Sequence, residues 1–213
     1  MFTYKNITIQ RLGHDGFLIS YKWKNICIDP FEIKETLQSD YIFITHNHRD
    51  HLSLDDIQKI IKDNTIIICP HACEENLMNI QNKKIFLDQN ENLTLDNFWL
   101  KTLPAYNIDK FRSPWVPYHT KESGFVGFIF DFDWTILYHA WDTDIIPEME
   151  NISPDIALLP VSWVYTMTAQ EAIESIDLIK PKIVIPMHYD NIIWTLEDAK
   201  YLKENAKCEV IIL

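Results

Sequence analysis

Glycine is scarce in this sequence, and the few glycines present do not form a phosphate-binding loop. Only four of the 213 residues are Gly. Neither a G-x-G-x-x-G nor a G-x-x-x-x-G-K pattern occurs, which excludes the common glycine-rich nucleotide-binding loops. A G-x-S-x-G elbow, which would present a serine nucleophile, is missing as well. Any chemistry must therefore come from other residue types.

Long apolar runs and cysteine pairs are also lacking. No stretch is long and apolar enough to span a bilayer, and the N-terminal MFTYKNITIQRLGHDG lacks a signal-peptide layout. We therefore expect a cytoplasmic protein with no membrane insertion. The four cysteines form no C-x-x-C pair, and a chain of this size needs no disulfide framework. We expect reduced, mostly buried thiols.

Positive charge is limited too. The chain carries 19 Lys and Arg against 31 Asp and Glu, giving a net charge of −12, and it has no basic stripe. This argues against nucleic acid as a partner and favours a small-molecule substrate. Small anions stay possible because a bound metal can reverse the local field. The oligomeric state is left open.

Apolar residues make up 47% of the chain, which is enough to build one sizeable core. Its length favours a single domain over residues 1–213, composed of two closely packed halves. Short apolar or alternating runs predict strands at residues 6–11, 17–23, 25–29, 41–45, 65–69, 84–87, 98–103, 125–130, 134–138, 155–159 and 182–185.

Helices are predicted at residues 53–62, 168–179 and 195–204. Thr168 and Glu171 have the spacing of a capping box, while Ser53 and Thr195 can cap the other two helices. The interleaved elements predict an α/β or α+β fold of mixed sheets covered by helices. The segment 105–123, rich in Pro and without periodicity, is long for a connector, and such loops are often functional.

The most informative stretch is residues 45–51, THNHRDH. His46, His48, Asp50 and His51 follow a predicted buried strand and precede a predicted helix. Imidazole and carboxylate groups suit Zn, Mn or Fe. His46 and His48 can share one ion while Asp50 and His51 face another. The alternative, a solvated polar turn, would not explain four such ligands at one strand end.

This H-x-H-x-D-H pattern resembles the signature loop of the metallo-β-lactamase superfamily. Other segments match in the expected order: Asp29 in IDP, Asp142 in HAWDTD and His188 in PMHY. The resemblance covers nearly the whole chain, from residue 13 to 188, and is greatest to the lactonase-like and phospholipase-D-like small hydrolases. It implies a four-layer αββα sandwich with the metals at one edge.

By the same resemblance, His46 and His48 bind the first of two divalent metal ions, and Asp50, His51 and His188 bind the second. Asp142 bridges the two ions. Taken singly, His188 could equally be a strand-end histidine and Asp142 a turn cap. Zn²⁺ is the expected metal, with Mn²⁺ or Fe²⁺ as alternatives.

The third ligand of the first metal departs from the family pattern. Where many relatives carry a His, this chain has Asn107, and an amide is a poor zinc ligand. We predict that His119, in the long loop, folds back to supply the missing ligand. The alternatives are a surface-loop histidine at 119, with Asn107 or water completing a weaker site.

Several further residues are predicted to lie around the metals. His14 and His139 either line the pocket or orient a ligand, or serve as structural histidines. Asp29 is expected to orient the metal loop by hydrogen bonds. Trp141 and Trp163 stand where relatives often carry Gly. They can narrow the site, with Trp115 and Trp194 adding to an apolar wall, or be ordinary core aromatics.

The sequence thus predicts a metal-dependent hydrolase in which a hydroxide shared by two metals attacks a small ester, lactone or phosphodiester. Asp50 is expected to accept or pass a proton. The fold alone does not choose the bond. Two alternatives belong to other classes: a di-iron redox or oxygen-handling protein, and a binding protein of the same fold with a degenerate site.

Overall fold

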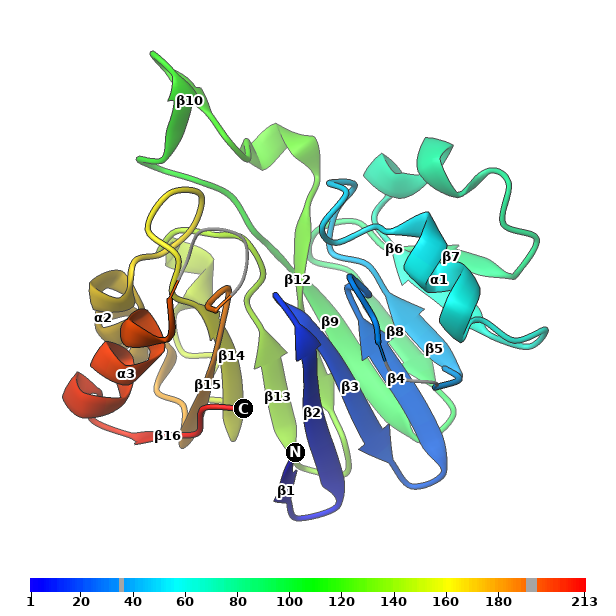
Figure 1. The fold of residues 1–213 in the computed structure, drawn as a ribbon, viewed down its shortest axis with the longest axis horizontal. Coiled ribbons are helices and arrows are strands. Elements are labelled where there is room, and N and C mark those ends of the chain that lie inside the picture. The colour runs from blue at the N-terminus through cyan, green and yellow to red at the C-terminus, as the bar shows by residue number, and fades with distance from the viewer. Residues whose placement is uncertain (35–36, 191–194) are drawn as a thin grey trace.

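Two seven-stranded sheets packed face to face form the body of the protein in the computed structural model (Figure 1). The structure describes residues 1–34, 37–190 and 195–213. The first sheet has the order β1-β2-β3-β4-β5-β6-β7 and the second β16-β15-β14-β13-β12-β9-β8.

The strands of the first sheet all precede those of the second along the chain, so each sheet belongs to one half of the sequence. The first sheet contains β1 (Phe2–Tyr4), β2 (Ile7–Gly13), β3 (Gly16–Tyr21), β4 (Lys24–Ile28), β5 (Tyr41–Phe43), β6 (Ile66–Cys69) and β7 (Lys84–Phe86). The second contains β8 (Asn92–Leu95), β9 (Phe98–Pro104), β12 (Val126–Asp131), β13 (Ile136–His139), β14 (Ile156–Pro160), β15 (Ile183–Met187) and β16 (Glu209–Val210).

The main core lies between the two sheets. Phe43 of β5 meets Phe128 and Phe130 of β12 edge-on, with ring centroids 5.2 and 5.0 Å apart. One continuous cluster of buried apolar side chains includes residues of both sheets. Because these aromatic and β-branched residues alternate along the strands, one face of each sheet is apolar and the two faces pack together.

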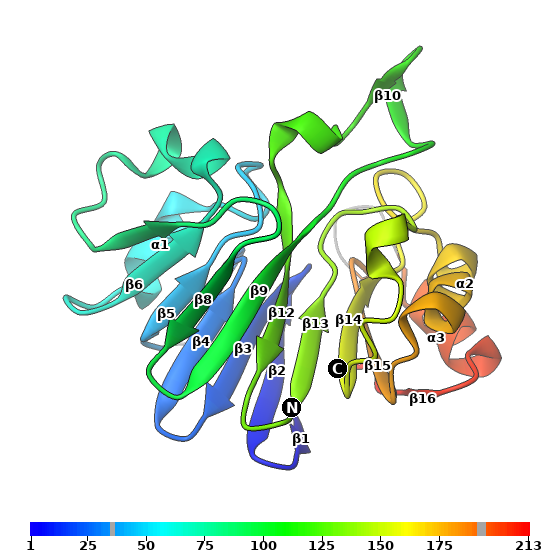
Figure 2. The ribbon, with the colours of Figure 1, turned by 180° about the vertical axis from the view of Figure 1, so that it is seen from behind.

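Helices cover the outer faces, which completes the predicted four layers (Figure 2). Helix α1 (Leu54–Ile60) packs through Ile57 and Ile60 on the outer side of the first sheet. Helices α2 (Ala169–Ile179) and α3 (Leu196–Asn205) lie beside β14 and β15. None of the helices within the described residues is long and apolar enough to cross a membrane.

The predicted helix caps are confirmed. The Ser53 hydroxyl accepts the backbone N–H of Asp56, and the Thr195 hydroxyl accepts that of Glu197. Thr168 and Glu171 form the full capping box, in which each side chain accepts the other residue's backbone N–H. These bonds satisfy donors that the first turn of a helix leaves without intrahelical partners.

The sequence does not predict several short elements at the margins. These are β1, β8, β16, the hairpin of β10 (Phe111–Ser113) and β11 (Val116–Pro117), which interrupts the long loop, and the 3₁₀ turns Lys121–Ser123 and Pro147–Met149. The helix expected to begin at His71 is present as two 3₁₀ turns, His71–Cys73 and Glu75–Leu77. The hairpin projects from one end of the sandwich (Figures 1 and 2).

Parallel pairing decides where the functional residues gather. β4, β5 and β6 pair in parallel, as do β13, β14 and β15. The carboxyl ends of parallel strands meet at one edge of a sheet, where ligands are commonly bound. The loops after β4, β5, β13 and β15 therefore leave the sandwich at one end, the end from which the β10–β11 hairpin projects.

Candidate metal centre

Asp29, the first residue after β4, holds the histidine loop that follows β5. Its Oδ1 accepts the backbone N–H of Thr45 at 2.8 Å, and its Oδ2 accepts the Thr45 hydroxyl at 2.5 Å. Oδ2 also lies 2.9 Å from His51 Nδ1. The structure thus places Asp29 where it orients the loop, as predicted, and turns His51 Nε2 toward the centre of the site.

Three imidazoles form one cluster at this edge. His46, His48 and His119 each offer a ring nitrogen, and these atoms lie within 4.8 Å of one another. Burial lowers the pKa of His46 well below its usual value and that of His119 to about 4. The structure therefore brings His119 back to the histidine loop and keeps it neutral, the protonation state in which imidazole binds metal.

Asn107 lies behind His119 and fixes its orientation. Asn107 Oδ1 accepts the backbone N–H of His119 at 2.9 Å and lies 2.9 Å from His119 Nδ1. The Asn107 amide nitrogen donates to Asp144 and to the carbonyl of Tyr165, which settles the amide orientation. With Nδ1 donating to Asn107, His119 Nε2 points toward His48, 3.4 Å from its Nδ1.

Asp142, in the loop after β13, stands between two sets of histidines. Its Oδ1 lies 2.5 Å from His188 Nε2. Its Oδ2 lies 3.4 Å from His51 Nε2 and 3.9 Å from His119 Nε2. Burial acts to raise the pKa of Asp142, but His188 and His51 hold it well below the usual value. The two oxygens of one ionised carboxylate thus face different imidazoles, the arrangement expected of a bridging ligand.

Asp15 belongs to the same centre, and the sequence analysis missed it. Its carboxylate is buried, contacts His51 Nδ1 and lies 3.6 Å from His188 Nε2. His14, Asp15, His51 and His188 form a group with ligand atoms within 4.8 Å of one another. Burial alone would raise the pKa of Asp15, but His51 and His14 lower it. Asp15 is thus an anionic partner of these imidazoles.

Asp50 and His139 are placed less centrally. Asp50 is a third exposed, and its Oδ2 lies 3.3 Å from His14 Nε2 and 3.8 Å from His51 Nε2. It is outside the three ligand groups found among the described residues, so its role as a metal ligand stays a prediction. His139 is buried beneath the site, with Nε2 3.3 Å from the carbonyl of Asp15. This position suits support of the β2–β3 turn.

The predicted aromatic wall has one member inside the site. Trp141 is fully buried, its ring centroid lies 4.4 Å from that of His46, and its indole N–H donates to His46 Nδ1 at 2.5 Å. Trp163 is 61% exposed and Trp115, on the projecting hairpin, is 89% exposed. Trp194 lies outside the described residues. Trp141 therefore packs on His46, whereas a closed wall of four tryptophans is not formed by the residues described.

Four of the site residues have left-handed backbone conformations without being glycine. The φ angles are 46° at His14, 43° at Asp29, 66° at Trp141 and 60° at His188. Such conformations cost about 1–3 kcal/mol each and persist only where the surrounding structure imposes them. The turns at this edge are therefore held in unfavourable geometry that directs these side chains inward.

The chemistry of the donor set fits divalent transition metals. The cluster contains imidazoles and carboxylates without cysteine, a combination that suits Zn, Mn or Fe. His46 Nε2 is buried and has no hydrogen-bond partner among residues 1–34, 37–190 and 195–213. A buried polar atom without a partner is costly, so this nitrogen is suited to bind a metal ion.

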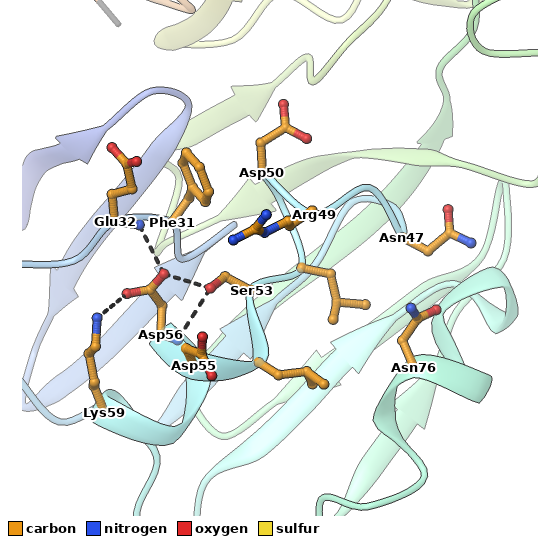
Figure 3. Close-up of a pocket in the computed structure, with 12 residues that line it drawn as sticks. Phe31, Glu32, Asn47, Arg49, Asp50, Ser53, Asp55, Asp56, Lys59 and Asn76 are labelled. Atoms are coloured by element: carbon orange, nitrogen blue, oxygen red, sulfur yellow. Dashed lines mark hydrogen bonds and ion pairs between the residues drawn. The ribbon is translucent and has the colours of Figure 1, made fainter. Parts of the chain in front are cut away.

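A cavity of about 820 Å³ adjoins the metal loop (Figure 3). Asn47, Arg49 and Asp50 of the loop line it, with Phe31 and the first turn of α1 opposite. Its wall mixes apolar, acidic and basic side chains. A small substrate can therefore lie beside the metal loop without opening the core.

Comparison with known proteins agrees with this geometry. Residues 8–188 match the family model described as the beta-lactamase superfamily domain. A UPF0173 metal-dependent hydrolase of Archaeoglobus fulgidus is 30% identical, over 95% of this chain and 94% of its own. One from Nanoarchaeum equitans is 32% identical, over 94% and 91%.

Among solved structures, a candidate metal-dependent hydrolase from Parabacteroides distasonis is 31% identical, with a TM-score of 0.81 over 97% of this chain and 92% of that one. The match runs nearly end to end in each case and includes every segment that contributes to the centre. The chain belongs to the metallo-β-lactamase superfamily and, within it, to the UPF0173 family of metal-dependent hydrolases.

Proposed function

We propose that this protein is a hydrolase that binds two divalent cations, with Zn²⁺ as the expected metal, and cleaves an ester, lactone or phosphodiester bond of a small substrate. One observation carries the proposal: the Asp142 carboxylate lies between His188 on one side and His51 and His119 on the other. The names of the UPF0173 relatives support the reaction class.

The residues that would hold the cations fall into two sets around Asp142. His46, His48 and His119 would hold the first, since their ring nitrogens lie within 4.8 Å of one another. His51 and His188, with Asp50 at the edge, would hold the second. Asp15 and Asp29 would orient His51 from behind, because carboxylates paired with a ligand imidazole fix its tautomer and direction.

Bound there, such cations would activate water as a nucleophile at neutral pH and polarise the bond to be cleaved. The protein supplies the arrangement around them. The buried Trp141 and Phe125 exclude water from the back of the cluster. Asp50, which lines the cavity 3.3 Å from His14 Nε2, would take up a proton from the attacking group and return it to the leaving group.

Metal analysis followed by a substrate panel tests this function. We expect about two zinc ions per chain in protein purified without chelator, and cleavage of a carboxylic or phosphoric ester that stops on chelation and returns with added zinc. Asp142→Ala should lose metal, whereas Asp177→Ala, an exposed carboxylate on α2, should retain both ions. Full activity in metal-free protein, or a metal content near zero after growth with zinc, would refute the proposal.

A further inference from the structure

The arginines of this protein are confined to one region. Among 19 basic residues only three are arginine, namely Arg11, Arg49 and Arg112. Arg11 precedes the His14–Asp15 turn, Arg49 lies between His48 and Asp50, and Arg112 lies on the β10–β11 hairpin. All three thus stand at the edge of the sandwich that holds the metal centre, while lysines supply the rest of the basic surface.

Arg11 links two turns of the fold. Its guanidinium donates to the carbonyl of His14 at 3.2 Å and to that of Tyr189 at 2.5 Å, and it stacks on the Tyr189 ring 3.9 Å from the centroid. These contacts join the two turns that carry His14 and His188. Two donors of Arg11 are therefore used in holding these turns together.

Arg49 and Arg112 differ from Arg11 because neither has a hydrogen bond or an ion pair within the described parts of the chain. Both side chains are exposed, although the protein carries 31 acidic residues that could pair with them. In Figure 3, Arg49 lies among the side chains lining the cavity, next to Asp50. Its guanidinium is therefore available to a molecule in that cavity.

Arg112 approaches the centre from the other side. Its neighbour Phe111 pairs with Pro117, two residues before the buried His119, so the hairpin begins directly at the metal cluster. Two guanidiniums without partners among the described residues thus lie on segments that adjoin the cluster, Arg49 on the metal loop beside His48 and Arg112 on the hairpin that leads to His119.

We propose that Arg49 and Arg112 bind the negatively charged group of the substrate, so that the enzyme prefers substrates carrying a phosphate or carboxylate oxyanion beside the bond that is cleaved. Guanidinium forms paired, charge-assisted hydrogen bonds with such groups, which an ammonium group does not match in geometry. A chain with net charge −12 would otherwise repel a small anion. This inference rests on the proposed function and specifies its substrate class.

The test uses substrate pairs of similar size that differ chiefly in charge. For the carboxylate, p-nitrophenyl succinate is compared with p-nitrophenyl butyrate. For the phosphate, bis(p-nitrophenyl) phosphate is compared with its neutral methyl triester. The zinc-loaded wild type is assayed beside Arg49→Gln, Arg112→Gln, the double variant and Arg49→Lys. Lys59→Gln serves as the control, since it removes one positive charge from the same cavity wall.

We expect each Arg→Gln change to lower kcat/KM for the anionic member of one pair roughly tenfold or more, and to leave the neutral member nearly unchanged. The pair that responds identifies phosphate or carboxylate. Arg49→Lys should recover only part of the loss, and Lys59→Gln should have little effect. Binding of phenylphosphonate, followed by calorimetry, should weaken in the same variants while zinc content stays at the wild-type value.

Equal losses on charged and neutral substrates, or no loss on either, would overturn the assignment of these arginines while leaving the hydrolase proposal intact. Hydrolysis of none of the four substrates would instead count against the proposed function. In that case the phenylphosphonate titration still decides the arginine proposal, because unchanged binding by the double variant would refute it.

Discussion

At the scale of single residues, Asn107 and His119 together present one imidazole to the cluster. They are twelve positions apart, and each forms hydrogen bonds with the other through backbone and side chain. The histidine faces the cluster and the amide holds it from behind. A histidine at a displaced position along the chain can thus reach the cluster when a neighbouring polar side chain fixes its ring.

Replacing Asn107 by Ala should weaken the first metal site without unfolding the protein. The change removes the acceptor for His119 Nδ1, and loss of such a partner typically lowers metal affinity about 10- to 100-fold. Competitive zinc titration with a chromophoric chelator measures the effect, and circular dichroism checks the fold. Asn205→Ala, an exposed amide on α3, is the matched control. Unchanged zinc affinity in Asn107→Ala would contradict the assigned role.

The exposed side chain of Trp163 can be tested for a role in substrate selectivity. Its side chain is 61% exposed in the loop after β14. We expect Trp163→Gly to broaden substrate use, raising kcat/KM for bulky acyl groups relative to small ones. Trp134→Gly, which removes another exposed tryptophan from a turn away from the metal centre, should leave that ratio as it was. Equal ratios in all three proteins would exclude Trp163 as a selectivity residue.

At the scale of elements, the capping box of α2 links helix stability to the site. Glu171 accepts the backbone N–H of Thr168 at 2.7 Å and also binds Lys110, at the base of the hairpin, at 2.7 Å. Lys110 in turn lies 3.4 Å from Asp144, which holds Asn107. The first turn of α2 therefore supports the loop that carries His119.

Thr168→Ala should lower the free energy of unfolding by about 1 kcal/mol, because one backbone donor of the first turn loses its acceptor. Chemical denaturation followed by circular dichroism measures the change. Thr168→Ser keeps the hydroxyl and should be close to the wild type. A Thr168→Ala protein as stable as Thr168→Ser would show that the cap contributes nothing.

Elements with strong local signals could be predicted from the sequence. The apolar run of β5 and the Thr168–Glu171 spacing each determine their structure locally, and both are observed. β1, β16 and the β10–β11 hairpin are short or exposed and take their form from their neighbours. For that reason no pattern in the sequence predicts them.

The candidate site likewise combines residues that a local pattern predicts with residues that only the tertiary fold brings together. The histidine loop is a local pattern and could be recognised, whereas Asp15 lies in a turn whose sequence has no ligand spacing. Only the tertiary fold brings the β2–β3 turn to the segment after β15, where the His188 N–H donates to the His14 carbonyl, and so brings Asp15 to His51 and His188. Likewise, the choice between Asn107 and His119 depends on how the long loop folds, which spacing alone does not determine.

At the scale of the whole molecule, Asp155 joins the two halves at the end of the sandwich opposite the candidate metal centre. Its carboxylate accepts from Lys182 at 2.7 Å and from the backbone N–H of Ile136, both in the second half. It also accepts from Tyr4 at 3.1 Å and Lys5 at 3.3 Å in the first half. This buried acid is thus a polar contact between the sheets, apart from the aromatic core.

The pH dependence of stability should report this contact. Burial acts to raise the pKa of Asp155, but Lys182 and the other donors lower it from 3.8 to about 2. A carboxylate whose pKa is lower in the folded state stabilises the fold above the unfolded pKa. That stabilisation, about 2 kcal/mol, is lost as pH falls from about 4 toward 2.

Asp155→Asn should therefore reduce the free energy of unfolding by about 2 kcal/mol at pH 7. Below pH 4 its curve should approach that of the wild type, because the wild-type carboxyl is then becoming protonated. Urea denaturation of metal-free protein at a series of pH values measures both curves. In the difference between them, the contribution of the acids of the metal centre to the free energy of unfolding cancels. A difference that stays constant from pH 7 to the lowest pH at which both proteins fold would mean that the charge of Asp155 does not hold the two halves together.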